Sequence, residues 1–227
     1  EKTYREIPLD WVDDVILCDD ASQDGTAELA KKLGIRELII HERNRGYGGN
    51  QKSLYQRALA LDADIIILLH PDYQYTPKLL VPMIHLLGEG LFDVVLGSRI
   101  LGKGALEGGM PLYKYLANRF LTLIQNLLGG HKLSEYHTGY RAFTKEVLFK
   151  IPFNENSEDF LFDNQILSQA IYGGFNIGEI TCPTLYFADA SSINFKRSVV
   201  YGLGVLKVSF MHFLQRKGLA AFSLYRF

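Results

Sequence analysis

The chain has 227 residues, of which 48% are apolar and 22% are charged, so it can bury the core of a globular protein. Its formal net charge is −1, which excludes the overall basic field of nucleic-acid-binding proteins, and we expect no nucleic-acid partner. The two cysteines, Cys18 and Cys182, have neither metal-site spacing nor the density of a disulfide scaffold. They indicate reduced thiols in the cytoplasm.

No apolar stretch reaches the ~18 uninterrupted residues that a membrane span needs, and the polar start does not resemble a secretory signal. The segment 198–214 contains Lys207 and His212 and therefore predicts a buried or interfacial helix. The tail 198–227 is consistent with packing on the sheet, which we favour, or with lying on a membrane surface. We expect a cytoplasmic protein, with the cytoplasmic face of a membrane as a possible location.

Strand and helix patterns alternate through the first hundred residues. The β-branched run 15–18 is typical of a strand buried on both faces. This alternation predicts an α/β domain in which helices flank a mostly parallel sheet. We expect strands at 15–18, 37–41, 64–69 and 92–99, helices at 27–33, 51–61 and 78–87, and a glycine-rich loop at 44–50.

The second half is less regular but shows no linker, internal repeat or low-complexity tract, so we expect one domain over residues 1–227. Its patterns predict helices at 110–128, 160–172 and 198–216, and strands at 138–143 and 177–183.

The first predicted strand ends in an acidic loop containing Asp19, Asp20 and Asp24. Ligand sites of parallel sheets lie beyond the carboxyl ends of the strands. These carboxylates can accept hydrogen bonds from a base and a ribose, and the following helix start offers free N–H groups to an anion. The alternative is local helix capping, which explains Asp24 but not the Asp19–Asp20 pair.

A second acidic loop, His70-Pro71-Asp72, follows the strand at 64–69. One carboxylate at a strand end can hold Mg²⁺ or Mn²⁺ together with two phosphates, and His70 and Asp72 are the candidate ligands. The alternative for this segment taken by itself is a simple turn. The loop 44–50 offers glycines for close backbone approach, and Lys52 and two arginines, Arg43 and Arg45, could meet phosphate.

Together these segments resemble the GT-A-fold glycosyltransferases of family 2, in particular the dolichyl- or polyprenyl-phosphate sugar transferases. The resemblance covers nearly the whole chain. It is carried by 19–26 as the nucleotide loop, Asn44-x-Gly46, His70-Pro71-Asp72 in the place of the family's Asp-x-Asp, Gly97-Ser98-Arg99, and 138–143 in the acceptor region.

The resemblance implies an inverting transfer from a nucleotide-diphosphate sugar, UDP- or GDP-linked, that uses Mg²⁺ or Mn²⁺. It implies that Asp20 contacts the base or ribose and that Asp72 binds the metal and the diphosphate. It divides the domain into a nucleotide-binding half at about 1–100 and an acceptor-binding half at about 101–227. The chain departs from the family at His70, and the family's leading strand is missing from the sequence as it stands.

The acceptor decides which residues do the chemistry. A hydroxyl of a glycan needs a general base, for which Asp159 and Asp163 are the candidates, unless this cluster is only an acidic helix start. A lipid phosphate is already anionic and needs cations instead. The residues proposed to contact the acceptor or the diphosphate are Arg99, Tyr140, Arg141, Lys196 and Arg197. An alternative for the whole chain is a non-catalytic sugar-nucleotide-binding protein that retains the fold, since His70 replaces an aspartate.

Overall fold

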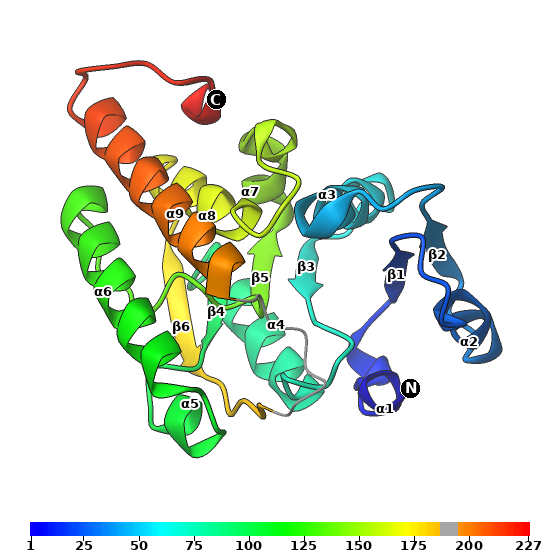
Figure 1. Cartoon of the computed structure of the whole chain (residues 1–227). Helices are drawn as coiled ribbons and strands as arrows, with labels where there is room; N and C mark the ends of the chain where they lie inside the picture. Colours follow the sequence, from blue (N-terminus) through cyan, green and yellow to red (C-terminus); the bar gives the residue numbers. More distant parts are fainter. Residues whose placement is uncertain (187–194) are drawn as a thin grey trace.

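The computed structural model describes residues 1–186 and 195–227, and strands and helices alternate along its first half as predicted. Figure 1 shows the first strand pair and its helices on one side of the molecule. The elements of this half are α1 (Lys2–Arg5), β1 (Ile16–Asp19), α2 (Thr26–Lys32), β2 (Glu37–Ile40), α3 (Gly46–Ala60), β3 (Ile65–Leu68), α4 (Leu80–Gly88) and β4 (Val94–Ser98), with the 3-10 turns η1 (Leu9–Trp11) and η2 (Pro77–Leu79).

The second half contributes two further strands and the longest helices of the described chain. The short helices after residue 100 were not predicted, because a single helical turn contains too few residues to show a period. The elements are α5 (Gly104–Glu107), α6 (Leu112–Gly129), β5 (Arg141–Thr144), α7 (Lys145–Lys150), α8 (Phe162–Tyr172), β6 (Ile177–Thr181) and α9 (Phe195–Arg216), with η3 (Phe153–Glu155) and η4 (Ser223–Tyr225).

The strands form two separate sheets. β1 and β2 are a parallel pair, and the larger sheet has the order β3-β5-β4-β6. β5 runs antiparallel to both of its neighbours, whereas β4 and β6 are parallel. The described residues place no strand between β1 and β3. The predicted α/β fold with a mostly parallel sheet is confirmed, with β5 as the antiparallel exception.

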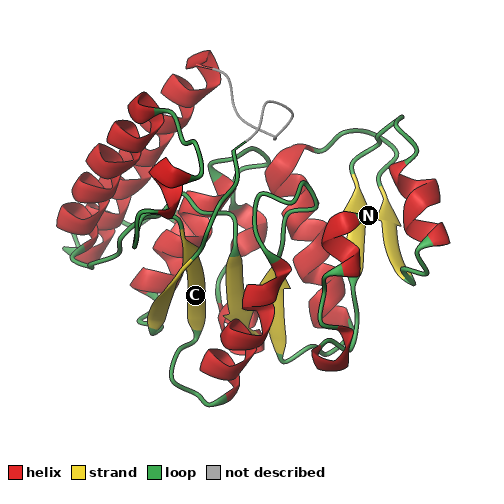
Figure 2. Ribbon diagram, turned by 90° about the horizontal axis from the view of Figure 1, so that it is seen from below, coloured by secondary structure: helices red, strands yellow, loops and turns green. Residues whose placement is uncertain are grey.

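Alternate side chains of the central strands enter two different cores, as expected for a strand covered on both faces. Val94 and Phe143 pack with residues of α3, α7 and α8. Val95 and Ala142 point the other way and pack with residues of α4. Figure 2 shows helices on both sides of the sheet. The polar ends of the strands are therefore held on a rigid layered scaffold.

Two predictions about local structure need correction. The glycine-rich segment 46–50 is the start of α3 and not a loop. The final helix α9 does not simply pack on the sheet: it lies beside α6, and its outer face is exposed. In both places tertiary contacts override the local pattern.

Candidate active site

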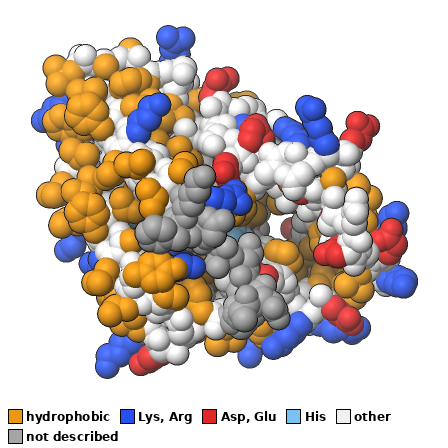
Figure 3. All heavy atoms as spheres, in the orientation of Figure 1, with side chains coloured by type: hydrophobic (Ala, Val, Ile, Leu, Met, Phe, Trp, Pro, Cys, Tyr) orange, Lys and Arg blue, Asp and Glu red, His pale blue; other side chains and the backbone are white. Residues whose placement is uncertain are grey.

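A large cleft separates the β1–β2 pair from the larger sheet and encloses about 1550 Å³. The space-filling view shows the surface hollowed there (Figure 3). One part of the cleft is apolar and lies between the edges of β1 and β3, with Ile16 and Ile66 in its walls. A second part is lined by His70, Pro71, Asp72 and Asp163, and a third by residues of α6 and α9. The loop that follows β3 thus lies in the cleft, as the strand-end rule predicts, whereas β1 lines it only as far as Cys18 and the loop 19–25 does not line it.

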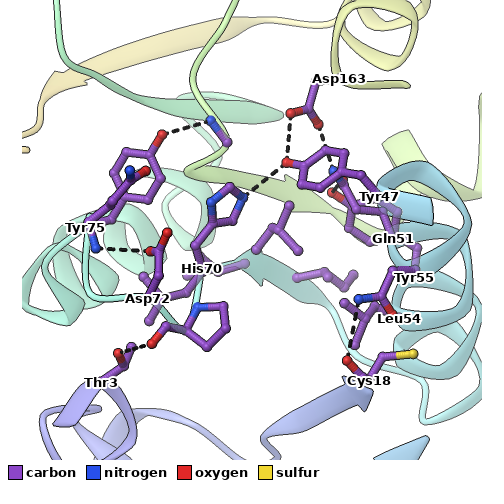
Figure 4. Close-up of a pocket in the computed structure, with 18 of the residues that line it drawn as sticks. Thr3, Cys18, Tyr47, Gln51, Leu54, Tyr55, His70, Asp72, Tyr75 and Asp163 are labelled. Atoms are coloured by element: carbon purple, nitrogen blue, oxygen red, sulfur yellow. Dashed lines mark hydrogen bonds between the residues drawn. The ribbon is translucent and has the colours of Figure 1, made fainter. Parts of the chain in front are cut away.

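Four side chains from three parts of the chain converge in the polar part of the cleft (Figure 4). The Tyr47 hydroxyl donates a hydrogen bond to Oδ2 of Asp163 at 2.8 Å and lies 3.0 Å from Nε2 of His70. Gln51 Nε2 donates to Oδ1 of the same carboxylate at 2.8 Å. α3 supplies Tyr47 and Gln51, α8 supplies Asp163, and His70 follows β3. The carboxylate of Asp163 is therefore held in place from two sides.

These contacts determine the protonation of His70. Because the Tyr47 proton points to Asp163, the tyrosine oxygen can only accept from His70, so Nε2 of His70 carries a hydrogen. Burial lowers the pKa of His70 despite the nearby carboxylates of Asp163 and Asp72, so the imidazole is neutral. Burial also raises the pKa of Tyr47, which stays protonated. A neutral His70 could ligate a metal only through Nδ1.

Asp72 is half-buried, lines the cleft, and has Oδ1 accepting from the N–H of Gln74 at 3.1 Å. Among residues 1–186 and 195–227, no three His, Cys, Asp or Glu side chains gather into a metal-binding cluster. The donor set still fits Mg²⁺ or Mn²⁺, because such ions are commonly held by one or two carboxylates and completed by substrate phosphates and water. Asp72 is one of the carboxylates that line the cleft, and it lies in the loop that follows β3.

Asp20 ties the first acidic loop to the start of α3. Its carboxylate accepts from the N–H of Arg45 at 2.8 Å and of Gly46 at 2.9 Å, and lies 2.7 Å from Nδ1 of His41. Partial burial raises the pKa of Asp20, but these three hydrogen bonds outweigh it and hold the pKa below its ordinary value. The carboxylate is thus ionised and oriented at the end of β1.

The remaining polar residues predicted for the nucleotide loop have local partners. Asp19 is buried and accepts from the Ser22 hydroxyl at 2.5 Å, and Asp24 accepts from the N–H and hydroxyl of Thr26, the first residue of α2. Asn44 donates weakly to the carbonyl of Asp20 at 3.4 Å. The N-cap of α2 is Gly25, and the side chains of Asp19 and Asp24 are held by contacts within their own loop.

The glycines of α3 approach protein backbone and not open space. A Cβ on Gly46 would lie 2.6 Å from the carbonyl oxygen of Glu158, and one on Gly48 would overlap the carbonyl of Ser157. Lys52 is buried and donates to the carbonyl of Asn156 and to Glu158, each at 2.5 Å. In this structure these residues join α3 to the loop before α8. The predicted contact of Lys52 with phosphate would require this ion pair to open.

Arg99 lines the cleft, but its guanidinium already has partners. It forms an ion pair with the buried Glu135 at 2.6 Å and donates to the Tyr186 hydroxyl and the His137 carbonyl. Burial lowers the pKa of Arg99, yet the Glu135 charge outweighs this and keeps it protonated. The same pair lowers the pKa of Glu135 against its burial. Arg99 therefore offers a fixed and largely neutralised cation to this part of the cleft.

Tyr140 and Arg141 were predicted to contact the acceptor directly, but they lie in the core and not on the cleft surface. Both are fully buried. The Tyr140 hydroxyl donates to the carbonyl of Thr76, and the Arg141 guanidinium donates to the carbonyls of Thr138, Asp163 and Tyr136. Arg141 also pairs with the Asp163 carboxylate at 3.9 Å, so it positions α8.

The two candidate bases differ in surroundings. Asp163 lines the cleft, whereas Asp159 is exposed and pairs with Arg197 at 2.9 Å. This pair links the start of α8 to the start of α9. The side chain of Lys196 lies outside the described residues.

Comparison with known proteins identifies the chain. The family model described as "Glycosyl transferase family 2" matches residues 10–151. The chain belongs to glycosyl transferase family 2. The match includes both acidic loops, the start of α3 and β5, so most of the elements around the cleft lie inside the family region.

Relatives of this glycosyltransferase include proteins named for lipid-phosphate acceptors. The UDP-N-acetylglucosamine–dolichyl-phosphate N-acetylglucosaminyltransferase of Methanococcus voltae is 28% identical over 86% of this chain and 86% of its own length. The dolichyl-phosphate hexose transferase of Haloferax volcanii is 29% identical over 85% of this chain and 80% of its own. An uncharacterized protein of Methanocaldococcus jannaschii is 31% identical over 82% of this chain and 75% of its own. The predicted resemblance to the polyprenyl-phosphate subgroup is confirmed.

The GT-A fold is likewise confirmed by solved structures. Glucosyl-3-phosphoglycerate synthase of Mycobacterium tuberculosis, solved with Mg²⁺ and UDP, has a TM-score of 0.64 at 21% identity and covers 92% of this chain and 70% of that one. Its complex with Mn²⁺, UDP-glucose and phosphoglyceric acid has a TM-score of 0.62.

The sequence did not indicate several residues of this site. Tyr47 and Gln51 reach Asp163 from α3, whereas the sequence predicts a loop at Tyr47. His41 follows β2 as Asp19 ends β1, so the strand-end rule could have found it. Glu135 carried no sequence signal, because only the fold brings it to Arg99.

Proposed function

We propose that this glycosyltransferase transfers a sugar from a UDP- or GDP-linked donor, with inversion, to a polyprenyl phosphate, with a glycan hydroxyl as the alternative acceptor. The observation that carries the proposal is the continuity of the cleft. It runs from Asp72 and Asp163 to the apolar side chains of α6 and α9. An acceptor with an anionic head and an apolar tail fits such a path.

The donor assignment is supported by the loops after β1 and β3. Asp20 is ionised next to the end of β1, and the polar side chains of Tyr47, Asn50 and Gln51 in α3 line the cleft on this side. The related synthase of M. tuberculosis was solved with UDP in the same fold. We assign the nucleotide to the side of the cleft formed by residues up to about 100, and the acceptor to the side formed by α6, α8 and α9.

The metal assignment rests on Asp72. This carboxylate would hold Mg²⁺ or Mn²⁺ beside the donor diphosphate, where the cation supplies charge neutralisation for the departing group. His70 contributes through its hydrogen bond to Tyr47, which helps to hold Asp163. The substitution of histidine at this position therefore does not remove the carboxylate that the metal needs.

Transfer with inversion is a single displacement. An acceptor oxygen forms a bond to the anomeric carbon from the side opposite the diphosphate, while the bond from that carbon to the diphosphate oxygen breaks and its electron pair leaves with the nucleotide. A phosphate acceptor has no proton to lose at neutral pH. For a hydroxyl acceptor, Asp163 or Asp159 would have to take the proton.

A donor and acceptor screen tests the proposal. Thermal shift with UDP- and GDP-sugars, with and without Mn²⁺, should show metal-dependent stabilisation by one nucleotide class. Turnover should then follow with a short-chain polyprenyl phosphate and not with the dephosphorylated alcohol. Metal-dependent nucleotide binding with no turnover on either acceptor class would instead favour a non-catalytic nucleotide-binding protein.

A further inference from the structure

The amphipathicity of α6 is reversed with respect to the protein core. Its buried side is polar, with Asn118, Thr122 and Gln125 each less than 7% exposed. Its outer side is apolar, and Leu116 is 58%, Phe120 58%, Leu123 55% and Leu127 66% exposed. The spacing of these four residues places them on one side of the helix. A soluble surface helix shows the opposite arrangement, so this side of α6 is adapted to an apolar environment.

α9 extends the same surface. It lies beside α6 and exposes Val200, Leu203 and Phe210, while Val205 and Val208 face the core. In the space-filling view, hydrophobic side chains gather over α6 and α9 on one side of the molecule (Figure 3). We call this surface, made by the outer residues of α6 and α9, the α6–α9 face.

The two chain segments that form the α6–α9 face carry charge of a single sign, although Arg197 at the start of α9 pairs with Asp159. The sequence contains no aspartate or glutamate in 108–134 or in 195–227, although the whole chain has a formal net charge of −1. These two segments contain nine lysines and arginines. Among those with described side chains, Arg119, Lys207 and Arg216 are exposed. An apolar surface with surrounding cations is complementary to a membrane that contains anionic lipids.

We infer that the α6–α9 face docks on the surface of an anionic membrane, with its leucines and phenylalanines at the acyl boundary and its lysines and arginines among the headgroups. The described helices contain no segment long and apolar enough to cross a membrane. The cleft opens onto this face, because Phe120 of α6 and Leu203 of α9 line it. This inference extends the proposed function, since a membrane-bound acceptor would then reach the cleft without leaving the bilayer.

A second copy of the chain fits this face less well. Two copies joined through it would bring cationic segments without compensating carboxylates against each other, which costs free energy. An anionic lipid surface instead neutralises those charges. The sign of the charge therefore selects the membrane as the partner.

Vesicle flotation with the full chain tests the inference. Wild-type protein should bind to vesicles that contain phosphatidylcholine and phosphatidylglycerol, and it should bind far less to vesicles of phosphatidylcholine alone. The double variant Leu123→Gln/Leu127→Gln, at two residues of the face that do not line the cleft, should bind these vesicles at least about tenfold more weakly, because two apolar side chains no longer leave water. The matched control Phe149→Gln/Leu91→Gln alters residues that are 82% and 60% exposed outside the face and should bind as wild type.

The possible outcomes separate this inference from the proposed function. Circular dichroism should show both double variants folded, and donor thermal shift should be unchanged in them, because no lipid is present. An Asp72→Asn variant should still bind vesicles. Equal vesicle binding by the two double variants, or none by the wild type, would overturn the inference. A dimer in sedimentation that only Leu123→Gln/Leu127→Gln dissociates, without vesicle binding, would identify the face as a contact between copies.

Discussion

Nδ1 of His41 lies 2.7 Å from Oδ1 of Asp20, and these two residues each follow one of two neighbouring parallel strands. The ionised Asp20 accepts from Nδ1–H, and Nε2 of His41 lies 2.8 Å from the hydroxyl oxygen of Ser53. A chain of hydrogen bonds therefore runs from α3 through His41 to the carboxylate that we assign to the nucleotide. His41 orients Asp20 without needing to touch a ligand.

Replacing His41 with alanine should destabilise the fold and weaken donor binding together. A hydrogen bond to a charged carboxylate contributes about 1–2 kcal/mol at such a partly buried position. Urea unfolding and donor thermal shift measure the two effects. His85→Ala, which removes an exposed histidine of α4 whose ring contacts Trp11, is the control for donor binding and should leave it unchanged. Unchanged donor binding in His41→Ala would separate Asp20 from the nucleotide.

Asp72→Asn should abolish metal-dependent donor binding and leave the fold intact, because Asp72 lies in a half-buried turn and not in the core. Loss of a carboxylate ligand should weaken the metal by at least the ~10–100-fold that follows loss of a supporting residue. Calorimetry with Mn²⁺ and the donor is the measurement. Asp10→Asn, at an exposed carboxylate of η1, is the control. If the asparagine variant binds metal and donor normally, the assignment of Asp72 is wrong.

Asp159→Asn distinguishes the two acceptor classes. If the enzyme uses Asp159 as the base for a hydroxyl acceptor, its turnover with that acceptor should fall by ~10²–10⁴-fold. Turnover with a phosphate acceptor should fall far less. Stability should change little, because the Asp159–Arg197 pair is exposed. Steady-state rates with both acceptors and fixed donor make the comparison. The proposal of a phosphate acceptor predicts the smaller loss, and a large loss with polyprenyl phosphate would contradict it.

Gly48→Ala should destabilise the protein by about 1–3 kcal/mol, because the new methyl group overlaps the carbonyl of Ser157 and pushes α3 from the loop before α8. Gly129→Ala is the matched variant, since a Cβ at that helical position meets nothing within 4 Å. It should stabilise by about 0.5–1 kcal/mol. Denaturant unfolding measures the change in the free energy of unfolding of each variant. Equal changes in both would show that the close approach of α3 to the loop before α8 is not maintained in solution.

His212 should make the protein less stable in mild acid. Burial lowers its pKa to about 4 from the ordinary 6.5, and its Nδ1 lies 2.8 Å from the Ser168 hydroxyl. As the pH falls, the histidine is therefore protonated in the unfolded chain before it is protonated in the folded one. The free energy of unfolding is highest above about pH 6.5 and decreases towards pH 4. The loss approaches about 3 kcal/mol. Unfolding free energies across this range should fall less steeply in His212→Gln than in His85→Gln, and parallel curves would refute the assignment.

The sequence by itself determined the alternation of strands and helices and the position of the two acidic loops. Continuous apolar runs such as 65–69 favour burial, so they become strands covered on both faces, and the polar residues that follow must lie at a sheet edge. The motifs of 19–26, 70–72 and 97–99 carried the family resemblance because they are local in the chain. The direction of β5 could not be predicted, since an apolar strand pattern is the same in either orientation.

Only the tertiary structure decided what each polar residue contacts. Tyr47 reaches Asp163 across 116 positions of sequence, and Lys52 reaches Glu158 across 106, distances over which periodicity contains no information. The sequence also could not orient α6, because an amphipathic pattern shows that a helix has two sides but not which one faces the core. Burial of Asn118 beside Glu135 turns its polar side inwards and leaves its leucines outside, and this choice creates the α6–α9 face.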